Sequence, residues 1–178
     1  MELRPLRRAE IELIWTIDRG ERIERIYEWR DGALLLRDAP GDVSSWPTGT
    51  ADQHTPALYA CFDRGGDFTV AFDGKGLAGI AVLDRRPVTT RPDLLQLLLL
   101  HVGRDHRHHG LGARLFRHAQ ERARMWGAAG LYVSATPTEN TIRFYLGMGC
   151  RVILQPDPQL FAEEPEDIHL ECAVGDAS

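Results

Sequence analysis

The sequence predicts a single α/β domain that spans all 178 residues, with helices packed on a mixed β-sheet. One observation is an apolar strand at Leu94–Val102, followed by an amphipathic helix from Leu111 and a further strand at Gly130–Ala135. This strand–helix–strand order makes the two strands parallel neighbours. The other observation is an antiparallel hairpin over residues 68–84, whose turn contains two glycines. With 43% hydrophobic and 26% charged residues, the composition is that of a soluble globular domain.

The first third of the chain is expected to combine short helices, short strands and a long loop. Apolar residues between Ile11 and Trp29 recur every three or four positions, with a break around Asp18 and Gly20, which favours two short helices. The expected elements are, in order, a short strand at Glu2–Leu6, helices at 11–17 and 23–29, a turn at Asp31-Gly32, a strand at Ala33–Arg37, a loop at 38–50 long enough for a binding role, and a helix that Thr55-Pro56 opens and Gly65-Gly66 ends.

The second half is expected to alternate strands and helices. The strand at Leu94–Val102 is apolar nearly throughout, which is typical of a central strand covered on both faces. The helix from Leu111 ends near Gly127, and another begins within Thr136–Glu139, where N-cap, proline and capping-box residues are in register. The remaining expected strands are Phe68–Phe72, Leu77–Asp84, Arg151–Leu154 and Ile168–Ala173.

Cysteine usage and the lack of apolar runs restrict the location of the protein. Cys61, Cys150 and Cys172 are an odd number without CxxC spacing, which argues against a disulfide framework and favours small buried apolar residues. The first residues lack the features of a secretory signal, and no run of about 18 apolar residues could span a membrane. We therefore expect a cytoplasmic protein that binds no membrane.

Charge is unevenly distributed along the chain. The net charge of −5 argues against nucleic-acid binding, because such binding depends on neutralising phosphates. Residues 104–124 nevertheless contain six arginines and two acids, whereas residues 155–178 contain seven acids and no Lys or Arg. One anion-binding and one cation-binding surface can therefore coexist. The acidic segment is either a solvated loop or the border of a cleft that favours a cationic amine.

The junction between the apolar strand and the amphipathic helix is the most informative segment. A strand that enters a glycine-containing turn and then a helix directs unpaired backbone N–H groups at one spot, which can bind a phosphate or pyrophosphate. Gly110 and Gly112 leave the amides accessible, and Arg107 adds positive charge. The alternative is a tight turn with no ligand. The dinucleotide fingerprint GxGxxG does not fit, because Leu115 stands where its third glycine is required.

The same segment resembles a known family. Arg107–Gly112 is similar to the R/Q-x-x-G-x-G/A acetyl-CoA signature of the GNAT superfamily of N-acetyltransferases, and Val102 matches the valine that ends the preceding strand in that family. Asn140–Cys150 is similar to the family block N-x-x-x-x-F-Y-x-x-x-G-F, with Cys150 in place of the usual aromatic residue. The two blocks occur in the order and spacing of the family.

The resemblance implies a fold, a cosubstrate and site residues. The implied fold is a GNAT-like mixed sheet of about six or seven strands, mostly antiparallel with a central splayed parallel pair and helices on both faces. The cosubstrate is acetyl-CoA. The residues implied to bind it are Leu100, His101 and Val102 by strand-like pairing with the pantetheine arm, Arg107, His108, His109, Gly110, Leu111, Gly112 and Ala113 around the pyrophosphate, and Asn140 at the arm.

Tyr145 matches the tyrosine that commonly protonates the departing thiolate in this family. Backbone donors can stabilise the oxyanion of acyl transfer, and a phenol can supply the one proton that a thiolate needs. The alternative is a core tyrosine with its hydroxyl satisfied nearby. A base is also expected, because an amine must be neutral to attack. The strand has no carboxylate, only Gln96, so the nearest candidate is His101, with a packed strand-end histidine as the alternative; Ser134 is a weaker candidate for orienting water.

A metal site is not expected, although His106, His108 and His109 lie close together in the sequence. Side chains in a turn diverge, and no Cys, Asp or Glu at ligand spacing completes a tetrahedral set.

The sequence thus predicts direct acetyl transfer to the amine of a small molecule or peptide, with cationic amines among the candidates, by a monomer or homodimer. The alternative functions are an acyl-CoA-binding regulatory module without turnover and a nucleotide-binding protein. The acceptor itself is not predicted, because acceptor loops vary freely on a shared scaffold. Trp46, Tyr59 and Phe62 either line its pocket or belong to the core.

Overall fold

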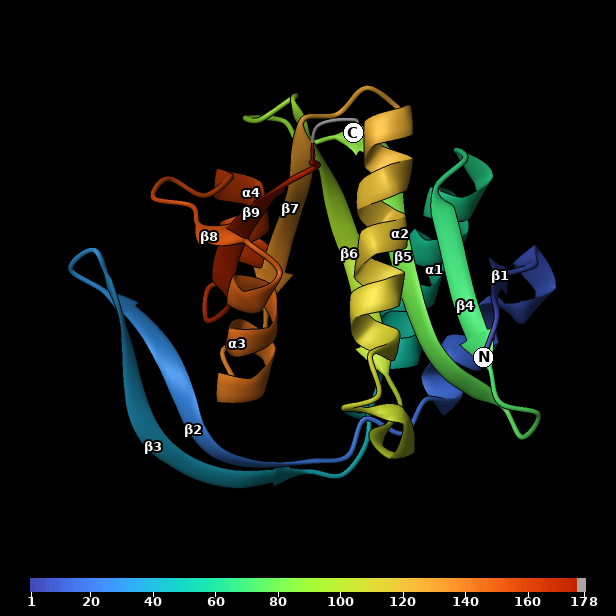
Figure 1. The fold of residues 1–178 in the computed structure, drawn as a ribbon, viewed down its shortest axis with the longest axis horizontal. Coiled ribbons are helices and arrows are strands. Elements are labelled where there is room, and N and C mark those ends of the chain that lie inside the picture. The colour runs from blue at the N-terminus through green and yellow to red at the C-terminus, as the bar shows by residue number, and fades with distance from the viewer. Residues whose placement is uncertain (176–178) are drawn as a thin grey trace.

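The computed structural model of the chain, described here for residues 1–175, contains a seven-stranded sheet and a separate two-stranded hairpin (Figure 1). The large sheet has the strand order β1-β4-β5-β6-β7-β9-β8. Its strands are β1 (Leu3–Pro5), β4 (Asp67–Phe72), β5 (Leu77–Pro87), β6 (Leu94–Val102), β7 (Gly130–Ala135), β8 (Arg151–Val152) and β9 (Ile168–Ala173). The hairpin consists of β2 (Glu21–Arg30) and β3 (Ala33–Val43).

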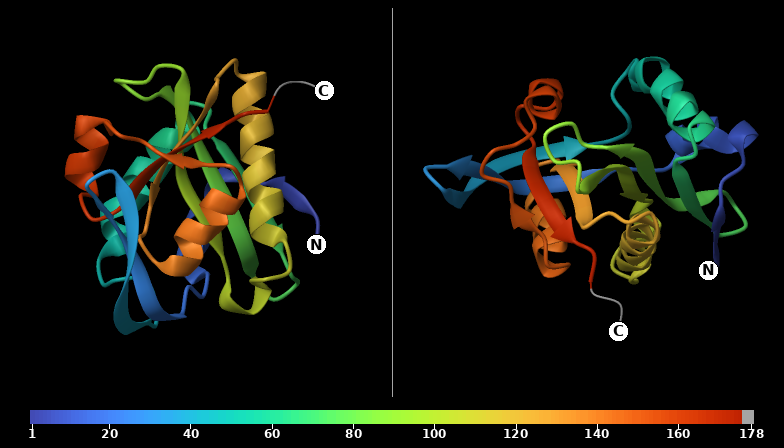
Figure 2. Two further views of the ribbon diagram at one scale, coloured as in Figure 1. Left: turned by 60° about the vertical axis from the view of Figure 1, so that its left-hand side comes forward. Right: turned by 90° about the horizontal axis from the view of Figure 1, so that it is seen from above.

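Helices cover both faces of the large sheet (Figure 2). α2 (Leu111–Met125) and α3 (Glu139–Gly147) pack on one face, in a core that includes Leu115, Phe116 and Ile142. The 3₁₀ helix η1 (Arg8–Thr16) and α1 (Thr50–Asp63) pack on the other face. A short 3₁₀ helix, η2 (Arg104–His106), follows β6, and α4 (Pro158–Glu163) precedes β9. Because β6 lies between the two helical layers, both of its faces are covered, and this explains its apolar sequence.

The central strands β6 and β7 are the only parallel pair among the described strands, and they diverge. Leu94–Gln96 pair with Gly130–Tyr132, and the pairing ends there. β6 continues to Val102 while paired only with β5. Opposite β5, Val82 pairs with Leu99 and Leu83 with Leu97, so Leu98 forms a β-bulge, a feature often found beside active sites. The predicted mixed sheet with a splayed parallel pair is confirmed.

The prediction of a helix at 23–29 was wrong, since these residues belong to β2. The extra residue at the register shift between Ile23 and Arg25 lies on β3, so β2 itself is uninterrupted. β2 is half-buried at the four consecutive residues Ile26–Trp29, so its apolar residues do not alternate, and Ile23, Ile26 and Tyr27 fall at spacings of three and four that imitate a helix. The turn at Asp31 and Gly32 has positive φ at both residues (51° and 79°), the conformation that a two-residue hairpin requires.

Three further boundaries differ from the sequence prediction. The expected loop at 38–50 is partly strand, because β3 runs to Val43. α1 begins at Thr50 rather than at Thr55, and Pro56 lies inside the helix. The first half of the acidic segment contains α4, whose N-terminus is capped by the Asp157 carboxylate through the N–H groups of Gln159 and Leu160.

Two of the three cysteines are joined, contrary to the prediction that all three are free. Cys150 and Cys172 form a disulfide, and Cys61 is free and buried. β8 pairs antiparallel with β9, with Arg151 opposite Glu171, so the next pair outward is Cys150 and Cys172. A pairing created by strand register cannot be read from cysteine spacing. Separately, none of the helices in residues 1–175 is long and apolar enough to cross a membrane.

Candidate active site

The start of α2 presents a row of unpaired backbone donors. Gly110 is the N-cap and has a φ of 81°, and His108 has a φ of 63°. Across the described chain, none of the amides of residues 108–113 has a hydrogen-bond acceptor, and the first bond of the helix is Arg114 N–H to Gly110 O at 3.1 Å. These donors and the positive end of the helix dipole converge at one place, which suits an anion such as a pyrophosphate.

The Arg107 guanidinium lies beside this turn but is held by backbone carbonyls. Its Nε donates to Val102 O at 3.1 Å and its Nη1 to Gly20 O at 3.0 Å. Arg107 therefore ties the end of β6 to the segment that leads into β2. A second link in the same direction is the Arg104 N–H, which donates to Asp18 O at 2.9 Å. The positive charge expected from the sequence is present, and the residue also fixes the position of the turn.

The β6 residues predicted to bind the pantetheine arm lie where β6 has left β7. Leu100, His101 and Val102 are all half-buried although they belong to a central strand. They are paired with β5 on one side, and on the other side the strand edge has no partner strand within the described residues. An extended arm could add to this edge as a strand adds to a sheet.

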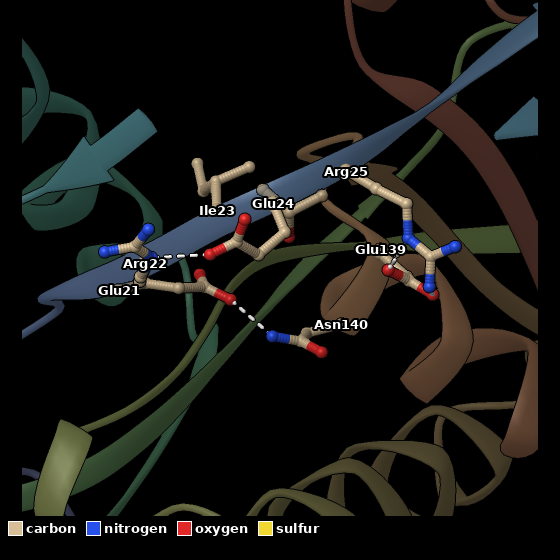
Figure 3. A pocket seen from close by; sticks show the side chains of 8 residues that line it. Glu21, Arg22, Ile23, Glu24, Arg25, Glu139 and Asn140 are labelled. Carbon is tan, nitrogen blue, oxygen red and sulfur yellow. Dashed lines mark hydrogen bonds and ion pairs between the residues drawn. The ribbon is translucent and has the colours of Figure 1, made fainter. Parts of the chain in front are cut away.

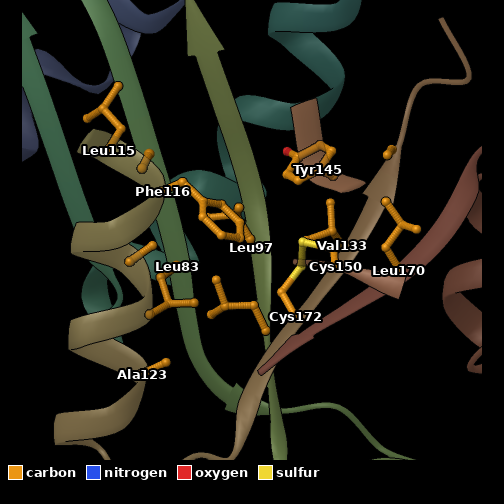
Figure 4. Close-up of a cluster of buried hydrophobic side chains, with 14 of the residues drawn as sticks. Leu83, Leu97, Leu115, Phe116, Ala123, Val133, Tyr145, Cys150, Leu170 and Cys172 are labelled. Atoms are coloured by element: carbon orange, nitrogen blue, oxygen red, sulfur yellow. A yellow bond between two sulfur atoms is a disulfide. The ribbon is translucent and has the colours of Figure 1, made fainter. Parts of the chain in front are cut away.

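Tyr145 lies on α3 and points into the space between β6 and β7 (Figure 4). Its ring is buried, with its centroid 5.8 Å from that of Phe116 and 5.1 Å from that of Phe144. Burial, and to a lesser extent the negative charge of Asp167, raise the pKa of Tyr145 above its usual value. Its hydroxyl makes no hydrogen bond to any residue that the structure describes, so it is free to donate to a ligand in the gap.

His101 faces the opposite layer of the sheet from Tyr145. Its ring makes an edge contact with Trp46, with centroids 4.7 Å apart, and Trp46 in turn contacts Trp15 at 4.9 Å. Burial, followed by the charges of Arg19 and Arg107, lowers the pKa of His101 to about 3. The imidazole is thus neutral at pH 7. Its ordinary pKa, on which the prediction of a base depends, is not kept in this environment.

Asn140 is exposed at the start of α3, and its Nδ2 donates to Glu21 Oε1 at 3.0 Å across a small cavity of about 90 Å³ (Figure 3). On the same side of this cavity, Arg25 forms two hydrogen bonds of 2.8 Å with Glu139. β2 is therefore attached to the beginning of α3 as well as, through Gly20, to the turn before α2. The sequence did not reveal this role of β2, because the segment was predicted to be helical.

A second, open cavity of about 490 Å³ lies between η1 and α1. Trp15, Tyr59, Glu12 and Asp52 line it, so aromatic rings and carboxylates are combined in one wall. Tyr59 thus lines a cavity, and Trp46 reaches the same region through Trp15. Phe62 instead packs against Phe68 in the core, with ring centroids 5.3 Å apart.

The histidines of the turn do not gather around one point. His106 pairs with Asp73, with 2.9 Å between Nε2 and Oδ2, whereas His108 and His109 are exposed. Within residues 1–175 no group of three or more potential metal ligands is present. Ser134 on β7 lies 3.5 Å from His169 Nδ1, which is also 2.7 Å from the Tyr132 hydroxyl.

Comparison with known structures places this geometry in context. The nourseothricin acetyltransferase structure is 22% identical, with a TM-score of 0.71 and 98% of each chain covered. A candidate streptothricin acetyltransferase of Bacillus anthracis, in complex with acetyl coenzyme A, is 14% identical, with a TM-score of 0.72 and coverage of 97% of this chain and 99% of that chain. PaiA N-acetyltransferase of Thermoplasma acidophilum, in complex with coenzyme A, is 16% identical, with a TM-score of 0.62 and coverage of 97% and 98%. These similarities show a shared fold.

The sequence comparison gives the family. No curated protein sequence matches the chain. The model of the Acetyltransferase (GNAT) family matches residues 23–149, which is more than half of the chain and includes the turn before α2, Tyr145 and Asn140. The free amides of that turn and the open edge of β6 fit the acetyl-CoA that this family uses. The chain therefore belongs to the GNAT family of acetyltransferases and is an acetyl-CoA-dependent acyltransferase.

Proposed function

We propose that the protein transfers the acetyl group of acetyl-CoA directly to a primary amine of a small molecule or peptide. The observation that carries the proposal is the row of six amides at residues 108–113, which have no acceptor in the described chain and lie next to the open edge of β6. The proposed binding residues are those predicted from the sequence. The amides and Arg107 hold the diphosphate, residues 100–102 pair with the arm, and Asn140 contacts it from α3.

Tyr145 is proposed as the proton donor for the sulfur. Its raised pKa keeps the phenol protonated at neutral pH, and its hydroxyl has no competing partner in the described part of the protein. A thiolate whose conjugate acid has a pKa of about 8.5 needs only this one proton to leave. His101 is proposed to act as a neutral hydrogen-bond acceptor near the acceptor amine. With a pKa of about 3, it is a poor reservoir for a proton at pH 7.

The acceptor side favours a cationic amine, because the cavity between η1 and α1 combines Trp15 and Tyr59 with Glu12 and Asp52. Location in the cytoplasm and a monomeric or homodimeric state remain predictions from the sequence. The disulfide weighs against the location, because such bonds are rare in the cytosol.

The test is a screen of an amine library with acetyl-CoA, in which release of free thiol is measured. We expect thiol release with at least one primary amine and formation of the N-acetyl product. Binding of coenzyme A without thiol release for any amine would contradict the proposal and support a regulatory acyl-CoA-binding module.

Tyr145→Phe then tests the assigned donor. We expect kcat to fall about 10- to 100-fold, since one positioned proton donor typically contributes about 10² or more, while the Kd for coenzyme A, measured by calorimetry, stays within about twofold. Phe144→Leu, one residue earlier on the same helix, is the control for a change in packing. An unchanged kcat in Tyr145→Phe would remove Tyr145 from the mechanism.

A further inference from the structure

Asp167 occupies a distinctive position at the point where the chain enters β9. Ile168, the first residue of β9, pairs with Ala135, the last residue of β7. Asp167 therefore lies one step beyond the end of β7, at the end of the sheet where β7 has separated from β6. This is the same end from which Tyr145 points into the gap (Figure 4).

The carboxylate of Asp167 is half-buried and has no partner. Its backbone N–H donates to Glu164 O at 3.3 Å, but within residues 1–175 its side chain makes no hydrogen bond or ion pair. The charged groups around it are Glu164 and Glu166 on its own loop, and the charge of Asp167 is close enough to Tyr145 on α3 to raise the pKa of that phenol. Burial and the two neighbouring glutamates raise the pKa of Asp167 to about 7. Burying a carboxylate without a partner costs free energy, and such groups are concentrated at functional sites.

Other carboxylates near this end of the sheet and along β9 are already neutralised or hydrogen-bonded. Glu21 accepts the Asn140 amide, and Glu139 is paired with Arg25 and Arg143. Glu171, further along β9, is paired with Arg91 and Arg151. Asp167 therefore differs from these acids in being available to hold a proton. It also supplies a carboxylate, which β6 lacks, since Gln96 is the only polar side chain of that strand before His101.

We propose that Asp167 is the general base of the transfer, accepting a proton from the acceptor amine directly or through one water molecule. The inference rests on the proposed function. The ammonium gives one proton to Asp167, and the nitrogen lone pair forms the C–N bond with the acetyl carbonyl carbon. The C–S bond breaks, and the sulfur takes the Tyr145 proton. The second proton lost by the nitrogen returns to the Tyr145 phenolate through solvent, and Asp167 releases its proton to bulk water.

The position also restricts the substrate. A base flanked by Glu164 and Glu166 attracts a cation, so the acceptor is a primary amine that is protonated in solution. The acidic segment that the sequence singled out thus borders the acceptor side of the reaction through Asp167.

The experiment measures kcat/KM between pH 5.5 and 9.5 for the purified protein, with an amine identified by thiol release. The kcat/KM of the wild-type protein should fall as the pH drops below the pKa of Asp167, which is about 7. Asp167→Asn should lower kcat about 100-fold at pH 8 and abolish this acidic limb, with the Kd for coenzyme A unchanged, and Asp167→Glu should restore part of the rate. Glu166→Gln should move the limb to lower pH, because it removes a negative neighbour of Asp167.

Glu163→Gln is the matched control, because it removes the same charge from an exposed position on α4. It should leave both the rate and the limb unchanged. An Asp167→Asn protein that folds, keeps more than about one third of the wild-type rate and shows the same limb overturns the inference. If that variant does not fold, a limb that stays in place in Glu166→Gln overturns it instead. If the wild-type protein releases thiol with none of the amines in the library, the proposed function itself is contradicted. This outcome distinguishes a failure of the proposed function from a failure of the inference about Asp167.

Discussion

Burial and neighbouring charge give carboxyl groups different chemistry at different positions in this protein. Glu10 is buried, yet its carboxylate accepts two hydrogen bonds of 2.9 Å from Arg4 and one of 2.9 Å from the Arg7 N–H. These bonds hold the pKa of Glu10 well below its usual value. Asp167 has burial without such donors, and its pKa rises to about 7. The first arrangement stabilises a fold, and the second provides a proton acceptor.

Glu10→Gln should therefore destabilise the protein in a pH-dependent manner. Because the pKa of Glu10 is lower in the folded than in the unfolded state, its contribution is fully present above the unfolded pKa of about 4.3 and is lost as the pH falls toward the folded pKa. We expect a loss of about 1.5–3 kcal/mol at pH 7 and a smaller loss at pH 3. Urea denaturation at the two pH values measures the difference. An equal loss at both would show that the ion pairs contribute nothing.

Residue types and spacing predicted the place of the candidate site residues in the fold better than the chemistry of those residues. Gly110, Gly112 and Tyr145 were assigned from a motif, and the structure brings them to the gap between β6 and β7. The pKa of His101 could not be predicted, because Trp46 and Arg19, which surround it, come from segments 55 or more residues earlier in the sequence. Asp167 was noted only as one of several acids. Its burial depends on how β9 meets β7, which the sequence does not contain in readable form.

At the scale of elements, the turn before α2 combines two glycines that serve different purposes. Gly110 has a φ of 81°, and a Cβ built there would meet nothing within 4 Å, so the conformation alone requires glycine. A Cβ at Gly112 would lie 3.5 Å from the Phe144 ring and 3.6 Å from Val102, which are ordinary contacts. The two positions therefore predict different responses to alanine.

Gly110→Ala should weaken coenzyme A binding, whereas Gly112→Ala should not. An L-residue at a positive φ costs about 1–2 kcal/mol, which shifts the turn away from the conformation that aligns the amides and raises Kd about 5- to 30-fold. Calorimetric titration of both variants with coenzyme A tests the expectation, with thermal melting to confirm that each is folded. Equal Kd values in the two variants would show that the turn does not need its left-handed N-cap.

Elements with one uninterrupted pattern were predicted well, and elements with an irregularity were not. β6, α2 and the β4–β5 hairpin follow a single period, and their predicted bounds differ little from the structure. β2 has four consecutive half-buried residues instead of a strict alternation, and its apolar spacing imitates a helix. The Asp31-Gly32 turn was the signal that could have corrected this, because that dipeptide favours a two-residue hairpin and hence strands on both sides.

At the scale of the whole molecule, the two faces of the splayed sheet carry different parts of the proposed site. The face with α2 and α3 carries the free amides and Tyr145, whereas His101, Trp46 and the cavity between η1 and α1 belong to the other face. β2 and the residue before it contact both sides of the gap, because Gly20 is bound by Arg107 and Arg25 by Glu139. Cosubstrate and acceptor can then approach the gap from opposite faces.

The disulfide joins β9 to the residue before β8, at one edge of the large sheet, and its redox state can be measured. Cys150 and Cys172 are 22 residues apart, so the chain-entropy relation gives a contribution of about 3 kcal/mol. Thiol titration of the unfolded, unreduced protein should find one thiol, that of Cys61, and reduction should lower Tm. Cys61→Ser is the control, since it removes the free cysteine and should lower the count to zero. Three thiols in protein purified without oxidation, and no change of Tm on reduction, would show that the pair is reduced and that strand pairing, the Arg151–Glu171 ion pair and apolar packing hold β8 to β9 without the disulfide.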